Sequence, residues 1–144
     1  MREPAKNPCG SCPYRRDVPS GVWDASEYAK LPAYDADTSN QPTGVFLCHQ
    51  RSGAVCSGWA GCHDMDESLA LRLAVAMGTL DATTARQVVD YVSPVPLFDT
   101  GAQAAEHGLA ELTEPGEKAA RTIGKLVRKG VAAAGWTPRH TSRL

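Results

Sequence analysis

The sequence predicts a mostly α fold, with an irregular, metal-bound N-terminal half and at most a short strand pair, followed by a small helical bundle. All five cysteines lie within the first 62 of 144 residues, in a region that is also rich in glycine and proline. From residue 66 onward, apolar residues recur at helical spacing. The best strand candidate is the short run Val45-Phe46-Leu47-Cys48.

A chain of 144 residues suits one domain with a modest core. We divide it into a cysteine-ligated metal knuckle at residues 1–65, a helical bundle packed on it at residues 66–134, and a flexible basic tail at residues 135–144. The knuckle is rich in turn-forming residues and is therefore expected to be mostly loop. Its expected loops are residues 1–22, 33–44 and 50–65.

One short helix is expected inside the knuckle, between Asp24 and Leu31. Asp24 can cap its first turn, Glu27 stands at the capping-box position, and Pro32 ends it.

Four helices are expected in the bundle. The first begins near Leu69, with Asp64 or Asp66 as its cap, and Gly78 ends it. Asp81 can cap the second helix.

The last two helices are expected at residues 100–112 and at residues 115–134. Pro115 suits the first turn of a helix because its missing N–H would be unpaired there in any case. Pro94 and Pro96 keep the segment before these helices extended.

The cysteines are expected to act as ligands or catalytic thiols. The first 13 residues are polar and contain no apolar export signal, so we expect a cytoplasmic protein. An odd number of cysteines in a reducing compartment argues against a disulfide framework. No membrane contact is expected, because the most apolar stretch, Leu69–Leu80, is too short to span a bilayer.

Four cysteines are spaced as ligands of one metal site. Cys9 and Cys12 form a C-x2-C pair, and Cys48 and Cys56 come from a second segment. Two ligands two residues apart can bind one ion, and closing both segments around it pins a loop-rich chain. Four thiolates match tetrahedral zinc, so we expect Zn at Cys9, Cys12, Cys48 and Cys56.

The sequence also offers alternative ligands and an alternative cofactor for this site. His49 is adjacent to a ligand and is expected in the second shell, because neighbours rarely bind the same ion. Cys62 and His63 are alternative ligands. Pro13, directly after a cysteine, is typical of ferredoxin-type runs, and four cysteines also hold a 4Fe-4S cluster. Spacing leaves this choice open, and zinc is preferred because it is the commoner structural cofactor in small proteins.

A dithiol oxidoreductase is a third interpretation of the run Cys9-Gly10-Ser11-Cys12. In that fold the motif follows a strand and opens a helix, which lowers the pKa of one thiol. Here Pro13 and Pro19 follow the motif and no βαβ pattern is visible, so we disfavour it.

The motifs together resemble a known family. They are Cys9-x-x-Cys12-Pro13-Tyr14-Arg15-Arg16-Asp17, Phe46-Leu47-Cys48-His49-Gln50, Cys56-Ser57-Gly58-Trp59 and Leu71-Arg72-Leu73-Ala74-Val75. This set is similar to an uncharacterised family of small cysteine-motif proteins from bacteria, especially actinobacteria, and from bacteriophages. The resemblance covers roughly residues 8–80. It implies ligation by the same four cysteines, treats Cys62 as extra, and implies no activity.

Two arginines beside the C-x2-C pair are candidate partner contacts. Arg15 and Arg16, with Tyr14 and Trp59, could stack on and clamp nucleic acid. The simpler interpretation, which we prefer, is that the aromatic rings enclose the metal and an arginine donates to Asp17 or to a carbonyl group.

Charge is divided unevenly along the chain. Residues 1–117 carry 8 Lys or Arg and 16 Asp or Glu, whereas residues 118–144 carry 7 Lys or Arg and no acid. The basic segment, with Lys125, Arg128 and Lys129 on its predicted helix, can contact nucleic acid, a protein partner or the acidic body.

The sequence contains no catalytic motif of the common types, and we assign no catalytic residue. We expect a non-enzymatic binding or regulatory module for nucleic acid or a protein partner, built on structural zinc. The alternative is an iron–sulfur protein with a redox or sensing role.

Overall fold

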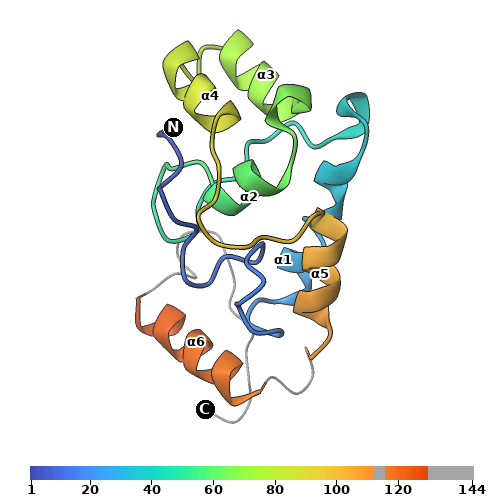
Figure 1. Cartoon of the computed structure of the whole chain (residues 1–144), viewed down its shortest axis with the longest axis vertical. Coiled ribbons are helices and arrows are strands. Elements are labelled where there is room, and N and C mark those ends of the chain that lie inside the picture. The colour runs from blue at the N-terminus through green and yellow to red at the C-terminus, as the bar shows by residue number, and fades with distance from the viewer. Residues whose placement is uncertain (112–115, 130–144) are drawn as a thin grey trace.

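The structure is a computed structural model that describes residues 1–111 and 116–129 (Figure 1). It is mostly helical, which confirms the predicted fold class. The α-helices of these residues are α1 (Ala25–Tyr28), α2 (Ser57–Cys62), α3 (Leu69–Ala76), α4 (Ala82–Val89), α5 (Gly101–Leu109) and α6 (Glu117–Arg128). Short 3-10 helices are η1 (Pro32–Asp35), η2 (Thr38–Asn40) and η3 (Met65–Glu67).

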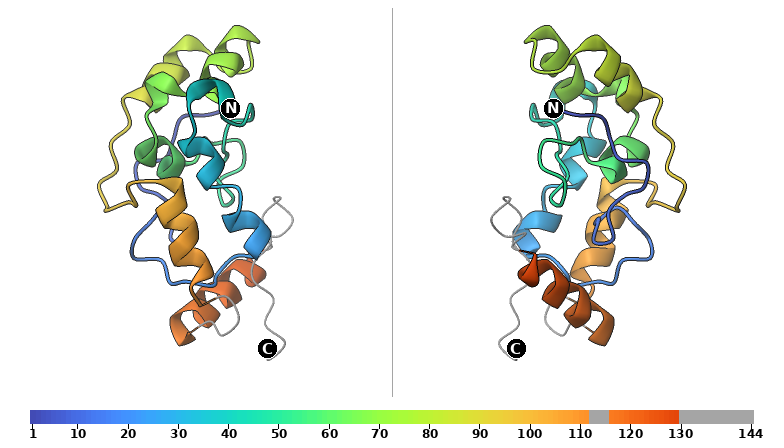
Figure 2. Two further views of the ribbon diagram at one scale, coloured as in Figure 1. Left: turned by 90° about the vertical axis from the view of Figure 1, so that its right-hand side faces the viewer. Right: turned by 90° about the vertical axis from the view of Figure 1, so that its left-hand side faces the viewer.

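The helices are distributed along an elongated molecule. Helices α3 and α4 pack together at one end, α6 lies at the other, and α1, α2 and α5 lie between them (Figures 1 and 2). Helix α5 packs against both α1 and η1. None of the helices in the described ranges is long and apolar enough to cross a membrane.

One hydrophobic cluster joins the two halves and extends from Cys9 to Leu126. Its largest fully buried side chains in the knuckle are aromatic: Tyr14, Trp23 and Trp59. The knuckle therefore has a hydrophobic core of its own, built around a few large rings. Such rings bury large areas and account for much of the stabilisation of a small core.

Most of the expected helix caps are confirmed. The Asp24 carboxylate accepts from Ser26 N at the start of α1. Asp81 accepts from Thr84 N at 2.7 Å. Thr100, which was not predicted as a cap, accepts from Gln103 N at 3.0 Å. Helix α1 ends at Tyr28 rather than near Leu31, because the chain turns into η1 there.

The cap of α3 differs from the expectation. Ser68, and neither Asp64 nor Asp66, accepts from Leu71 N at 3.2 Å. Asp64 instead caps η3, the 3-10 helix that the sequence did not predict. Gly78 ends the segment as expected, with a positive φ of 76° that glycine adopts without steric cost.

Helix α2 lies where only a loop was expected. Its sequence contains Gly58 and Gly61, and each glycine in a helix interior costs about 1 kcal/mol relative to alanine. Both glycines are closely packed, Gly58 against Cys12 and Gly61 against Leu97. Tertiary packing therefore selects this helix against its local preference.

The expected strand at Val45–Cys48 is reduced to a bridge. Within the described ranges only isolated bridges occur, including an antiparallel one between Leu47 and Val55. The partner segment cannot extend, because Gly53 turns on one side of it and α2 begins at Ser57 on the other.

The ends of the predicted bundle lie partly outside the described residues. Helix α5 ends at Leu109, and residues 112–115 and 130–144 are not described. The expected continuation of the last helix to residue 134 and the tail at residues 135–144 therefore stay predictions.

Candidate metal centre

A hairpin brings the second pair of cysteines together. Cys48 N donates to Ala54 O at 2.8 Å, and Cys56 N donates to Phe46 O at 2.9 Å. These bonds flank the bridge between Leu47 and Val55. The seven residues between Cys48 and Cys56 thus form a closed turn, which is why the wide C-x7-C spacing still yields neighbouring side chains.

The first pair of cysteines lies on a tight turn against this hairpin. Cys12 N donates to Cys9 O at 3.0 Å, which closes the C-x2-C turn. Cys9, Cys12 and Cys56 are buried, and Cys48 is partly exposed. Interactions among the four residues predicted as ligands show that they are neighbours, and Cys48 is the least buried of them.

The four thiols interact in a chain that runs Cys48–Cys9–Cys12–Cys56. Hydrogen bonds from Cys12 and Cys48, with a further one from His49, hold the pKa of Cys9 well below its usual value. Burial, followed by the hydrogen bonds to Cys56 and Cys9, raises the pKa of Cys12. Hydrogen bonding to Cys9 and then burial raise the pKa of Cys48. These donors therefore favour the thiolate form of Cys9.

Backbone amides also point at two of the sulfurs. Trp59 N donates to Cys56 Sγ at 3.5 Å, from the first turn of α2. The amides of Gln50 and Arg51 donate to Cys48 and favour its thiolate. Amide hydrogen bonds to cysteine sulfur orient and stabilise thiolate ligands in metal sites.

His49 lies beside the thiols, as predicted for a second-shell residue. Its Nε2 is 3.5 Å from Cys9 Sγ and 2.7 Å from Ser11 Oγ. Its ring stacks edge-on against Trp23, with the ring centroids 4.3 Å apart. Gln50 completes the group by donating to Ser11 Oγ at 2.5 Å.

Sequence reasoning missed Ser11, Trp23 and Gln50 in this role. Ser11 lies inside the C-x2-C turn, and Gln50 follows directly after Cys48-His49, so adjacency was the available signal. Trp23 could not be found this way, because its Nε1 reaches Ser11 O only through the tertiary fold, at 2.9 Å.

The side chains do not converge on a single point. In residues 1–111 and 116–129, no three His, Cys, Asp or Glu side chains are arranged so that they could hold a metal ion as they stand. All five cysteines, which lie in this part of the chain, have free thiols. The thiols suit a thiophilic ion in their chemistry, whereas the positions of the side chains in these residues do not form a metal site.

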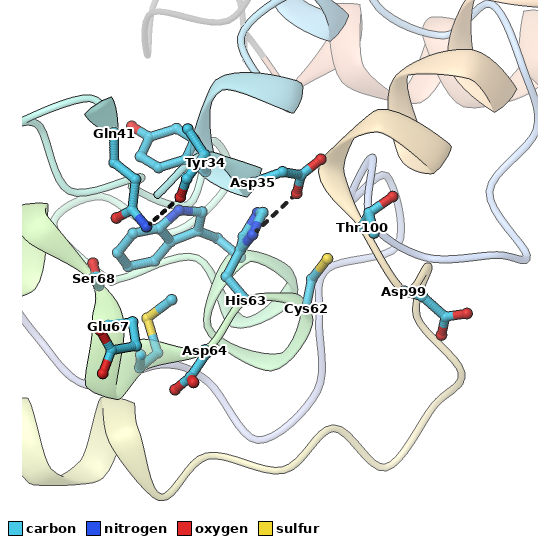
Figure 3. Close-up of a pocket in the computed structure, with 13 residues that line it drawn as sticks. Tyr34, Asp35, Gln41, Cys62, His63, Asp64, Glu67, Ser68, Asp99 and Thr100 are labelled. Carbon is cyan, nitrogen blue, oxygen red and sulfur yellow. Dashed lines mark hydrogen bonds and ion pairs between the residues drawn. The ribbon is translucent and has the colours of Figure 1, made fainter. Parts of the chain in front are cut away.

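Cys62 and His63, the alternative ligands, face a separate cavity. It has a volume of about 260 Å³, and its wall includes Tyr34, Asp35, Trp59 and Thr100 (Figure 3). His63 lies between two partners: Nε2 is 3.1 Å from the Tyr14 hydroxyl, and Nδ1 is 3.4 Å from Asp35 Oδ1.

The groups in this cavity do not form an activated nucleophile. Burial, together with the negative charges of Asp35 and Asp99, raises the pKa of the Cys62 thiol to about 12. Burial lowers the pKa of His63. A protonated thiol is a poor nucleophile. Asp35 mainly serves the fold, accepting from Gly101 N at 2.7 Å at the start of α5.

Comparison with known proteins places most of the chain in one family. Residues 4–129 match a family of unknown function, DUF6283. The chain belongs to this family. The match includes α6, well beyond the motifs at residues 8–80. No curated protein and no solved structure is significantly similar to the chain.

Arg15 and Arg16 of this DUF6283 member both make contacts within the protein. Arg15 donates to both oxygens of Asp17, at 2.8 and 2.7 Å, and to Pro8 O at 2.9 Å. Arg16 donates to Leu97 O at 2.7 Å and lies over the Phe98 ring. These contacts match the simpler interpretation of the pair as structural residues.

The basic residues predicted on the C-terminal helix are on the surface. Lys125, Arg128 and Lys129 are exposed at the end of α6, on the side away from Ile123 and Leu126, which are buried. They lie far along the molecule from the α3–α4 end (Figure 1).

Proposed function

We propose that this protein is a non-enzymatic binding module whose N-terminal half is organised by one zinc ion, held by Cys9, Cys12, Cys48 and Cys56. Its partner, nucleic acid or protein, binds at the basic C-terminal segment. The observation that carries the metal proposal is that four thiols from two distant segments are neighbours, three of them buried.

The surroundings of the thiols support a structural site. Amide donors to Cys48 and Cys56 stabilise thiolates, and His49 Nε2 reaches Cys9 Sγ. The rings of Trp23 and Tyr14 close off the site from water. A closed, fully protein-ligated site is typical of structural rather than catalytic zinc.

The proximity of the thiols favours a single ion over a cluster. Around tetrahedral zinc, with Zn–S bonds of about 2.3 Å, the sulfurs lie about 3.8 Å apart, which is near contact. A 4Fe-4S cube places four irons and four sulfides between its cysteines and separates them further. The hydrogen-bonding chain through Cys9 and Cys12 matches the closer arrangement.

Elemental analysis and a visible spectrum of protein purified without oxygen test this proposal. One zinc per chain and no visible absorbance are expected. Iron with sulfide and a brown chromophore would refute the zinc proposal and support the iron–sulfur alternative. Protein that is fully folded and holds neither would refute both.

A further inference from the structure

The exposed cations of α6 form a continuous stripe, which we call the α6 stripe. Its members are Lys118, Arg121, Lys125, Arg128 and Lys129. Successive residues of an α-helix are about 100° apart, which places all five side chains within an arc of about 100°. With a rise of 1.5 Å per residue, the stripe is about 16 Å long.

The stripe faces away from the body of the protein. Ala119, Ile123 and Leu126 are buried in the core cluster, and the arc they occupy is centred about 140° from the stripe. All five cationic side chains are exposed. The helix is therefore fixed by its apolar side and presents its cations to solvent.

Little in the described part of the chain neutralises these charges. Arg121 pairs with Glu117 at 3.3 Å, a contact between two exposed groups that contributes little. Within residues 1–111 and 116–129, no ion pair engages the other four members of the stripe. The sequence after Glu117 contains no acidic residue. The positive field at this end of the molecule is therefore available to an external polyanion.

We propose that the α6 stripe binds the phosphate backbone of nucleic acid, without reading base sequence. The inference rests on the proposed binding function and names its partner. Duplex DNA presents one phosphate per about 1.7 Å of axis, so a stripe about 16 Å long faces several phosphates at once. Contacts of this kind position a protein on nucleic acid but carry no sequence information.

Two other partners fit the stripe less well. An acidic protein would be expected to find aromatic anchors at the surface, and lysine, which supplies three of the five cations, is depleted at protein interfaces. A membrane-surface helix buries its apolar side in lipid, whereas Ile123 and Leu126 are already buried in the core.

The test uses full-length, metal-loaded protein and two labelled probes, a DNA duplex of about 20 base pairs and a single-stranded RNA of about 20 nucleotides. Fluorescence anisotropy gives the affinity at 50 and 200 mM salt. Neutralising three to five phosphates predicts that affinity for the duplex falls about 40- to 500-fold between these concentrations. The two probes show whether the backbone is preferred in double- or single-stranded form.

A double variant, Lys125→Gln/Arg128→Gln, tests the stripe itself. It is expected to weaken binding about tenfold or more and to reduce the slope of log affinity against log salt by about two. The matched control, Lys6→Gln/Arg86→Gln, removes the same charge from exposed positions outside α6 and is expected to bind like the wild type. The charge-preserving variant Lys125→Arg/Arg128→Lys is expected to retain binding.

Three results would overturn this inference: no binding of either probe by folded protein at 50 mM salt, an equal loss in the control variant, or equally strong binding of polyglutamate. The last would indicate an acidic protein partner. The metal content and circular dichroism of each preparation keep this test separate from the proposed zinc site. Binding that persists in metal-free, folded protein would refute the zinc scaffold and leave the stripe supported.

Discussion

The knuckle, residues 1–65, and the segment from α3 to α6 keep their backbones in place by different means. In the knuckle the helices are only 4 and 6 residues long, and many polar groups are paired through long-range contacts. Gln50 Nε2, for example, donates to Ser11 Oγ at 2.5 Å, and Ser57 Oγ donates to Ala5 O at 2.7 Å. From α3 onward, helices of 8 to 12 residues pair their own backbones, and α3, α4 and α5 have local side-chain caps.

This difference predicts where the molecule is fragile. A regular helix loses one contact when one residue changes, since its neighbours still pair along the chain. The knuckle depends on a few groups that each tie together distant segments, above all the four thiols. Substitutions near the thiols should therefore strongly reduce the stability of the whole knuckle. Substitutions in the helices from α3 onward should have small, local effects on stability.

The largest effect is expected for Cys12→Ser. Losing one ligand should release the metal and unfold the knuckle, because structural zinc contributes about 10–16 kcal/mol in small zinc domains. That exceeds the total stability of many domains, which is about 5–15 kcal/mol. Circular dichroism, limited proteolysis and metal content measure the change.

The matched control is Cys62→Ser, since Cys62 lines the cavity in Figure 3 and is not one of the four cysteines predicted to bind the metal. It should keep its metal and its fold. Loss of metal in this variant would show that the ligand set is wrong, and an intact knuckle in Cys12→Ser would show that no metal organises it.

The next largest effect is expected for Gly58→Ala. A Cβ at this position would overlap Cys12 Sγ and lie 2.8 Å from the Cβ of Tyr14, so α2 or the C-x2-C turn must shift. Overpacking of this kind costs about 1–3 kcal/mol. It should also weaken metal binding, as measured by competition with a chelator.

Gly10→Ala is the control for this variant. It adds the same methyl group inside the C-x2-C turn, where a Cβ would meet nothing within 4 Å. Equal metal affinity in the two variants would contradict the packing of α2 against the thiols.

In the helical segment, Ser68→Ala should remove the cap of α3 and cost about 1 kcal/mol. Asp66→Ala changes the residue that the sequence suggested as the cap, and a surface change of this kind should stay within about 0.5 kcal/mol. Denaturant unfolding measures the free energy of unfolding of both variants. A larger loss in Asp66→Ala would show that the cap is assigned to the wrong residue.

The smallest effect is expected for His63 and depends on pH. Burial lowers the folded-state pKa of His63, so the unfolded chain binds the proton more readily. Its contribution to stability is present above the unfolded pKa of about 6.5 and is lost as pH falls below that value toward the folded pKa. The thermal unfolding temperature of the wild type should fall more steeply from pH 7 to pH 5 than that of His63→Gln. If the unfolding temperatures of the two proteins change equally with pH, His63 does not contribute to the pH dependence of stability.

The sequence predicted the helical segment well because its signals are local. Asp81 lies directly before the helix it caps, and Gly78 lies shortly after the one it ends. The prediction of Asp64 or Asp66 as the cap of α3 failed because η3 occupies Met65–Glu67, which leaves Ser68 as the residue before Leu69.

The candidate metal centre was predictable as a set of residues and not as a geometry. Cysteine spacing selected Cys9, Cys12, Cys48 and Cys56, which are neighbours in the structure, and adjacency suggested that His49 lies beside them; that they bind a metal stays a prediction. The separation of Cys62 and His63 from this group was not visible in the sequence. Helix α2 causes it: Cys56 caps its N-terminus, while Cys62 ends it and His63 is its C-cap.

By itself, then, the sequence determined the helical fold class, most of the helix ends and the identity of the clustered cysteines, because each depends on residues close together in the chain. Only the tertiary structure decided that α2 forms despite two glycines and that Trp23 and Gln50 support the thiols. It likewise decided that Arg15 is turned inward, whereas the α6 cations face outward. These outcomes depend on which distant surfaces pack together, and packing energy outweighs local preferences of about 1 kcal/mol per residue.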